Sequence, residues 1–221
     1  MKKFEKISMP LGMVGVVGYM LHTIIGNLLW KEYNPITTDI SSLTAVGAPN
    51  AVILGFFTNV YGICTILFVA GLIIKSFRKY HLLTQVGYVV MMVMQIISMV
   101  GYSLFPLTGD KTVMNFQNKM HIIVTVAVVF TTIASGFIVA VGYLKQEKMK
   151  RLGRFVLIMS IVITLTGATN PIGMGMGLNI LGLTERLVIY SLQFMMFMLS
   201  YYYTFNKDEK NNLDIKTEWT I

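Results

Sequence analysis

Six long runs of apolar residues, separated by short polar segments, dominate the pattern of this chain. An apolar run of about 20 residues matches the hydrocarbon core of a bilayer, which is roughly 30 Å thick. Because lipid offers the backbone no hydrogen-bond partners, each run is expected to form a helix. The pattern predicts an all-α, polytopic membrane protein with one domain, residues 1–205, built as a six-transmembrane-helix bundle. The expected spans lie near residues 9–30, 51–74, 82–105, 120–144, 155–181 and 186–205.

Composition and charge support this class and predict an orientation. Charged residues make up 13% of the chain, against about 25% in a typical soluble domain. Of the 18 Lys and Arg residues, 14 lie at the N-terminus, in the second and fourth connections, and in the tail. By the positive-inside rule, both termini are predicted to be cytoplasmic. These basic helix ends also explain the net charge of +8. The sequence has no basic stripe of the kind that would indicate nucleic-acid binding. The tail, residues 206–221, mixes both charges and is predicted to be flexible.

Each of the three outward connections contains a proline, at Pro35, Pro106 and Pro171. Their spacing is compatible with a threefold hairpin repeat, although prolines that mark where helices stop are the stronger explanation. We expect Pro171 to interrupt the fifth span, because Phe155 to Asn170 covers only about 24 Å. The uncharged residues 172–178 are then either a segment that dips back to roof a pocket or the flexible end of a kinked helix.

Glycines line one side of the first span, at Gly12, Gly15 and Gly18. Small residues let two helices approach closely. This face is expected to pack against another helix. It is also the surface through which a homo-oligomer or another membrane protein would bind.

Most of the polar residues that could carry chemistry fall at one level, on the outward side or just below it. Ionisable groups are costly in a membrane, so their gathering at one level predicts a polar pocket that opens outward. Several also have plain structural roles: Asp39 with Ser41 and Ser42 could cap a short helix, and Glu185 could complement the start of the sixth span. The candidate residues are His22, Asp39, Ser41, Ser42, Asp110, His121, Asn170, Glu185 and Arg186.

A divalent metal is a further hypothesis for this pocket. His22, His121, Asp39 and Glu185 are the candidate ligands, since a site needs three or four of them. No two of these residues show a recognised ligand spacing. The two histidines could also ligate a haem if they faced across one plane, which nothing in their spacing indicates.

Several short motifs resemble a known bacterial membrane family. They are Tyr33-x-Pro35 through Asp39-x-Ser41-Ser42-Leu43, the turn at Gly47, the Gly101-x-x-x-Phe105-Pro106 step, and His121 at the next helix start. Together they resemble domain-of-unknown-function family 998, with a fainter likeness to eukaryotic Frag1/DRAM-type proteins. The resemblance implies six helices in a bacterial plasma membrane and marks Asp39, Ser41, Pro106 and His121 as positions of interest. It implies no reaction.

Three functions are compatible with these observations. The first is binding of a membrane lipid headgroup or another amphiphile, with Arg186 pairing to an anionic group and Asp39 and His121 orienting it. The second is a metal-dependent lipid hydrolase in which Glu185 shuttles the proton. The third is a non-catalytic accessory or immunity subunit that binds through the glycine face.

Overall fold

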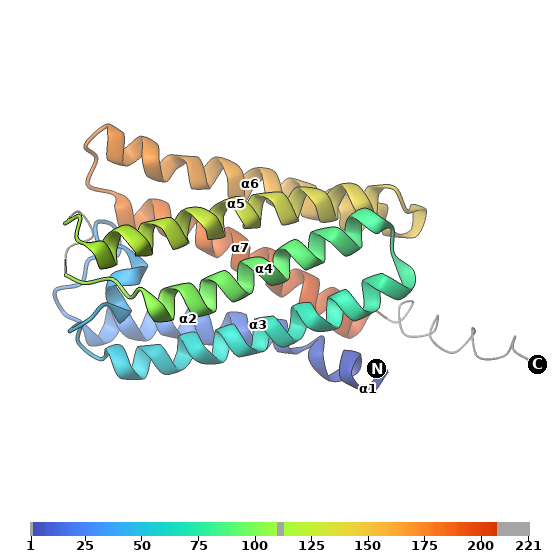
Figure 1. Ribbon diagram of the computed structural model, residues 1–221, viewed down its shortest axis with the longest axis horizontal. Coiled ribbons are helices and arrows are strands. Elements are labelled where there is room, and N and C mark those ends of the chain that lie inside the picture. The colour runs from blue at the N-terminus through green and yellow to red at the C-terminus, as the bar shows by residue number, and fades with distance from the viewer. Residues whose placement is uncertain (1, 110–112, 207–221) are drawn as a thin grey trace, which may run out of the picture.

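The computed structural model describes residues 2–109 and 113–206, and their regular structure is helical apart from one isolated bridge between Val46 and Thr108 (Figure 1). Asp110 and the predicted flexible tail beyond Asn206 lie outside the described residues. The long helices are α2 (Leu11–Leu29), α3 (Ala51–Lys79), α4 (Leu82–Leu104), α5 (Phe116–Leu144), α6 (Lys150–Gly175) and α7 (Leu181–Phe205). The short ones are α1 (Lys2–Ser8) and the 3-10 helices η1 (Ile40–Thr44) and η2 (Glu147–Met149).

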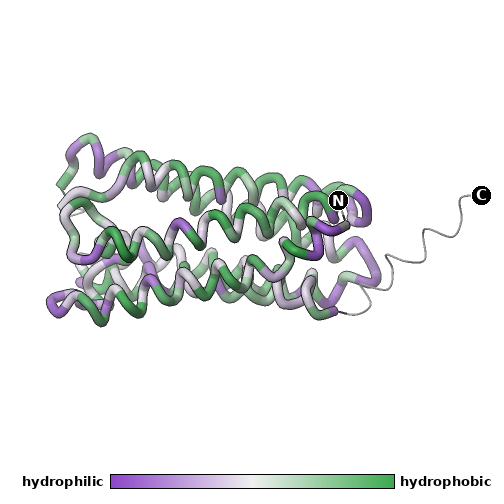
Figure 2. Tube along the Cα trace, turned by 90° about the horizontal axis from the view of Figure 1, so that it is seen from below, coloured by the Kyte–Doolittle hydropathy of each residue, from purple (hydrophilic) through white to green (hydrophobic). Residues whose placement is uncertain are grey.

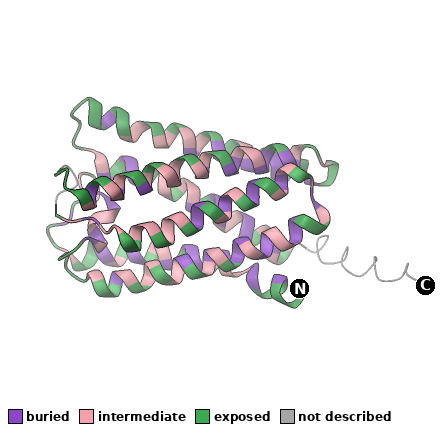
Figure 3. Cartoon of the chain, viewed as in Figure 1, coloured by how far each residue is buried: buried purple, intermediate pink, exposed green. Residues whose placement is uncertain are grey.

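Five helical stretches of the described residues, out of the six spans predicted, have the length and composition of membrane spans, and α7 is not one of them. Five stretches are long and apolar enough to cross a bilayer: Lys3–Leu29, Ala51–Lys79, Leu82–Leu104, Phe116–Leu144 and Glu147–Gly175. Apolar residues run along the bundle, and hydrophilic residues gather toward its ends (Figure 2). Exposed residues are found along the length of the helices (Figure 3). Many of them are large and apolar, among them Leu28, Phe56 and Phe130. Such a surface suits a lipid environment, which confirms the predicted multi-pass membrane class.

The six long helices close into a ring. Each packs against its neighbour in sequence, and α7 returns to pack against α2. Because the helices alternate in direction, two kinds of end result (Figure 1). We call one the basic end: it holds α1, the α3–α4 and α5–α6 connections and the last turn of α7. We call the other the loop end: it holds the α2–α3, α4–α5 and α6–α7 connections.

Glycines set the close helix contacts. A Cβ on Gly15 would lie 3.2 Å from the Tyr61 carbonyl oxygen, and one on Gly87 would lie 2.8 Å from the backbone nitrogen of Val139. These glycines let α2 approach α3 and α4 approach α5. The glycine face of α2 is therefore covered by α3 of the same chain. The sequence also suggested this face as a surface for a homo-oligomer or another membrane protein.

The larger cluster of buried apolar residues includes three tyrosines toward the basic end. Tyr88 of α4, Tyr143 of α5 and Tyr203 of α7 are buried, and their hydroxyl groups hydrogen-bond in series. The ammonium of buried Lys75 lies 4.9 Å from the centre of the Tyr203 ring. These polar groups satisfy one another inside an otherwise apolar core, as buried groups must.

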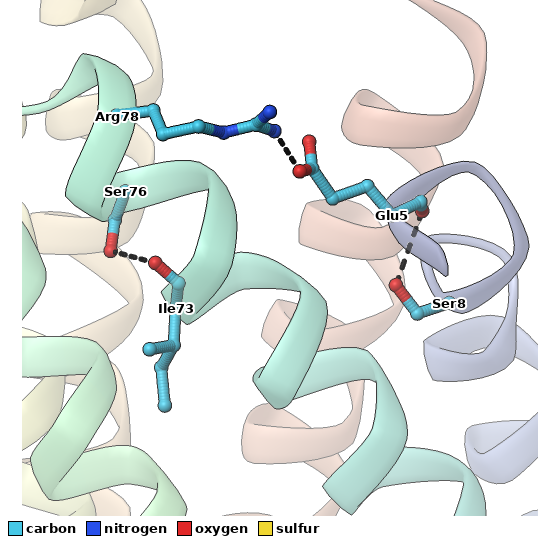
Figure 4. Close-up of polar contacts among 5 residues, drawn as sticks. All are labelled: Glu5, Ser8, Ile73, Ser76 and Arg78. Atoms are coloured by element: carbon cyan, nitrogen blue, oxygen red, sulfur yellow. Dashed lines mark hydrogen bonds and ion pairs between the residues drawn. The ribbon is translucent and has the colours of Figure 1, made fainter. Parts of the chain in front are cut away.

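The short helix α1 is tied to α3 at this end. Glu5 forms an ion pair with Arg78, and the Ser8 hydroxyl donates to the Glu5 carbonyl at 3.1 Å (Figure 4). The Ser8 side chain also fills the space beside Gly71. The first predicted span, residues 9–30, corresponds to α2, and α1 is a separate short helix before it, with Pro10 between the two.

Two of the three outward prolines act as expected and one does not. Pro106 lies two residues after Leu104, the last residue of α4, and Pro35 lies in a connection. Pro171 lies inside α6, which continues to Gly175. The prediction that Pro171 interrupts this helix is wrong. The missing hydrogen bond is tolerated, and the helix ends with Leu178 N–H donating to the Gly173 carbonyl (2.9 Å) while Gly177 takes a φ of +68°, a Schellman-type end.

Candidate functional site

The connection between α2 and α3 folds down onto the start of α7. A Cβ on Gly182 would overlap the Thr38 carbonyl oxygen and lie 2.6 Å from that of Pro35, so glycine is needed for this approach. One residue later, the backbone N–H of Leu183 donates to the Ile36 carbonyl at 2.9 Å. The α2–α3 connection is thereby held directly over the first turns of α7.

Arg186, one turn after Gly182, is the centre of this contact. Its Nη1 lies 2.7 Å from the Pro35 carbonyl oxygen, 3.2 Å from that of Thr38 and 3.0 Å from that of Gly182. Its Nη2 donates to the Tyr33 hydroxyl at 2.5 Å, and the guanidinium lies 5.4 Å from the centre of that ring. All four acceptors are uncharged oxygens. The Nε–H group makes no hydrogen bond within the described residues, so it remains available.

Tyr33 links the guanidinium to the rest of the connection. Its hydroxyl accepts from Arg186 and donates to the Asp39 carbonyl at 2.9 Å. Burial raises the pKa of Tyr33 to about 12, and the nearby guanidinium opposes part of this shift. The hydroxyl is therefore protonated at neutral pH and keeps its role as a donor.

The carboxylates beside Arg186 support η1. Glu185 accepts a hydrogen bond from the backbone N–H of Ile40, the first residue of η1. Asp39 accepts one from the Ser42 hydroxyl. Both carboxylates are buried, at 7% and 3% exposed. The helix cap predicted at Asp39 therefore exists in a different form, with Glu185 of α7 supplying the acceptor for the backbone. Glu185 lies within α7, which begins earlier than predicted, at Leu181.

Two hollows lie on either side of Arg186 and Tyr190. The first, which we call the α6–α7 groove, has a volume of about 460 Å³. It follows one face of α7 from Leu183 to Phe194, a length of about 16 Å at 1.5 Å per residue. The residues that line it are Met159, Leu183, Arg186, Leu187, Tyr190, Ser191 and Phe194. Apart from Arg186, Tyr190 and Ser191, its lining is apolar.

The second hollow, which we call the α2–α7 recess, has a volume of about 190 Å³. The residues that line it are Thr23, Ile24, Asn27, Leu28, Pro35, Arg186 and Tyr190. Arg186 and Tyr190 belong to both hollows, so one cationic residue joins an apolar groove to a more polar recess. This arrangement can hold a molecule with one apolar part, one anionic group and one polar part.

The other predicted site residues lie elsewhere. His121 is on α5, with Nδ1 2.8 Å from the Phe105 carbonyl oxygen and its ring 4.9 Å from that of Tyr102. Asn170 is in α6, and Ser41 lies partly exposed in η1. The predicted common pocket is thus divided, with Asp39, Ser42, Glu185 and Arg186 together and His121 on the α4–α5 side.

His22 is buried in α2, 5.5 Å from the Tyr19 ring between centres. Both of its ring nitrogens lack a hydrogen-bond partner within the part of the chain that the structure describes. No three His, Cys, Asp or Glu residues among the described ones lie close enough to hold a metal. The metal set proposed from the sequence therefore gains no support from the geometry.

Sequence reasoning missed a second group of polar side chains inside the ring. Gln95 of α4 and Gln193 of α7 are buried and approach the hydroxyl of Tyr61 on α3. The Thr65 hydroxyl donates to the Gln95 side chain at 3.0 Å. A signal was present, because a lone amide in the middle of an apolar span is expensive and needs partners. The missed residues at the two hollows, Asn27 and Tyr190, have a weaker signal, since interfacial amides and tyrosines are common.

Comparison with known families identifies the class. The chain matches the family model described as "Protein of unknown function (DUF998)" over residues 13–202, and it therefore belongs to this family. The resemblance inferred from the loop motifs is confirmed. No curated protein matches the chain. No solved structure matches it either.

Proposed function

We propose that this protein binds an anionic amphiphile of the membrane, with the anionic group on Arg186 and an apolar chain in the α6–α7 groove. The observation that carries the proposal is the continuity of that groove with the guanidinium. A molecule lying along α7 from Phe194 to Leu183 would keep its chain against apolar side chains and reach Arg186 near its outer end.

Charge supports an anionic ligand. The hydrogen-bonding partners of Arg186 named above are neutral oxygens, so they orient the guanidinium without neutralising its charge. A phosphate or carboxylate meeting the free Nε–H forms a charge-assisted hydrogen bond, which is about twice as strong as a neutral one. The α2–α3 connection thus holds Arg186 in a fixed direction, and Glu185 and Asp39 stabilise that connection.

Position in the bilayer supports a lipid. Arg186 is five residues into α7, about 7 Å from its start, which is the depth of the headgroup region for a helix that spans the membrane. With the basic end toward the cytoplasm under the positive-inside rule, the groove opens to the outer leaflet. The protein is then a lipid-binding protein of a bacterial plasma membrane.

The test is native mass spectrometry of the purified protein in mixed phosphatidylglycerol and phosphatidylcholine nanodiscs. Arg186→Gln should weaken binding of phosphatidylglycerol by about 10- to 100-fold, the effect of one charge-assisted contact. Arg151→Gln removes the same charge from the basic end, where the side chain is exposed, and should leave binding unchanged.

A second pair of variants separates binding from the structural role of Arg186. Leu187→Trp fills the groove at a residue that does not line the α2–α7 recess, and should also release the lipid. Ile63→Trp makes a similar change on the exposed surface of α3 and serves as its control. Equal lipid retention by Leu187→Trp and Ile63→Trp would refute the proposal.

A further inference from the structure

We infer that the ligand of this site is a phosphodiester lipid whose head is small, uncharged and rich in hydroxyl groups, and that this head occupies the α2–α7 recess. The inference rests on the proposed function and adds the chemistry of the headgroup. It follows from three properties of the recess: its polar lining, its lack of an anionic lining residue and its size.

Asn27 supplies unused hydrogen-bonding capacity in the recess. It is exposed on the last turns of α2, and its side chain has no hydrogen bond within the described residues. A side-chain amide offers two donors and one carbonyl acceptor. A hydroxyl both donates and accepts, so a head with adjacent hydroxyls matches this amide better than a group that only donates or only accepts.

The Tyr190 hydroxyl is oriented as an acceptor. Its proton is used in a 3.1 Å hydrogen bond to the Thr23 hydroxyl, which in turn donates to the Met20 carbonyl at 3.0 Å. This chain of donors leaves the lone pairs of the Tyr190 oxygen available to a ligand. The recess therefore presents a hydrogen-bond acceptor at Tyr190, and both donors and an acceptor at Asn27. The cation of Arg186 lies between the recess and the groove.

The lining charges exclude an ammonium head. None of the residues that line the recess carries a carboxylate, and Arg186 is itself positive. The nearby carboxylates of Glu185 and Asp39 are already bonded to the Ile40 N–H and the Ser42 hydroxyl. A choline or ethanolamine head would bring a second positive charge beside the guanidinium without a partner, which is unfavourable at low dielectric.

The size of the recess suits a small head. A volume of about 190 Å³ holds roughly six non-hydrogen atoms if each takes the ~30 Å³ share of a water molecule. A three-carbon polyol fits this space. An anion at Arg186 then joins this head to the apolar chain in the α6–α7 groove, which is the connectivity of a phosphodiester lipid.

The experiment measures binding of four lipids with identical acyl chains to the protein in phosphatidylcholine nanodiscs by native mass spectrometry. Phosphatidylglycerol should bind about 3- to 10-fold more tightly than phosphatidic acid, as expected for one or two neutral hydrogen bonds. Phosphatidylethanolamine and phosphatidylserine should bind more weakly than phosphatidylglycerol. Asn27→Leu should lower the affinity for phosphatidylglycerol to that for phosphatidic acid, and should leave the affinity for phosphatidic acid unchanged. Asn59→Leu, at an exposed position on α3, is the matched control.

The outcomes separate the two proposals. If no anionic lipid binds better than phosphatidylcholine, the proposed function itself fails. The headgroup inference alone fails if phosphatidic acid and phosphatidylglycerol bind equally well, or if an ammonium lipid binds best. It also fails if Asn27→Leu leaves the preference for phosphatidylglycerol intact, because the head would then lie outside the recess.

Discussion

The basic end and the loop end of this bundle treat their polar side chains differently. At the basic end, Tyr88, Tyr143 and Tyr203 bond to one another and Glu5 pairs with Arg78. At the loop end, Arg186 is held by neutral oxygens, and the Asn27 amide has no partner among the described residues. The two hollows also lie here, on either side of α7.

The two ends of the bundle thus differ in how their polar groups are satisfied. Polar groups that satisfy one another lower the cost of burial and stabilise the fold. Polar groups that are fixed in direction yet keep unused donors and acceptors are prepared for a ligand, because little ordering is needed on binding. The basic end is therefore suited to stability, and the loop end is where we propose that recognition occurs. The predictions below separate these two properties.

The largest effect is expected from Gly182→Ala at the loop end. The added Cβ would overlap the Thr38 carbonyl oxygen, so the α2–α3 connection must move off α7 and release Arg186. We expect a loss of about 3 kcal/mol in stability, the upper range for overpacking, and loss of lipid binding. Thermal unfolding and native mass spectrometry measure the two effects. Gly175→Ala is the control, because a Cβ there meets no atom within 4 Å; equal behaviour of the two variants would contradict this account of the contact.

A smaller effect, confined to stability, is expected from Tyr143→Phe at the basic end. The change removes the middle hydroxyl of the tyrosine series and should cost about 2 kcal/mol. Binding of phosphatidylglycerol should not change, because the proposed site is at the other end. The melting temperature with and without lipid tests this, and Tyr201→Phe at an exposed position is the control. A drop in affinity for Tyr143→Phe would show that the two ends are coupled.

The smallest effect is a pH dependence at Tyr33. Its pKa is about 12 in the folded protein against an ordinary value of 10, so folding favours the protonated form. The contribution of the protonated Tyr33 hydroxyl to the free energy of unfolding is fully present below pH 10 and is lost as the pH rises toward 12. The loss reaches about 1 kcal/mol by pH 11. The free energy of unfolding, measured from pH 9 to 11.5, should therefore fall less steeply with pH for Tyr33→Phe than for the wild type. Parallel slopes would mean that Tyr33 is not shielded by the α2–α3 connection.

Much of the architecture could be predicted from the sequence. The length of each apolar run and the absence of solvent partners for the backbone require helices, and the Lys and Arg pattern groups the connections into two sets. The prediction of a stop at Pro171 failed because a single missing hydrogen bond does not outweigh four further residues of helix that end in a glycine cap. The helix α7 begins earlier than predicted, because Glu185, which was expected to complement the helix start, lies inside the first turns.

The candidate site was predicted in part. Arg186, Glu185, Asp39 and Ser42 do lie together, because polar groups at one depth of a membrane share the few places where they can be satisfied. His121 shares their depth and lies on another side of the ring, bonded to the Phe105 carbonyl. Depth can be counted along a helix from the sequence, whereas the direction around the helix axis depends on which neighbours it packs against.

The sequence by itself determined the class of protein, the number of long helices, their alternation and the family. Tertiary structure decided which helices became neighbours and so which side chains met. Gly182 shows the reason: its lack of a side chain has meaning only because the Thr38 and Pro35 carbonyls lie against it. Hydrophobicity is a property of each residue and sums along the chain, while a binding site depends on distances between residues far apart in that chain, which only packing sets.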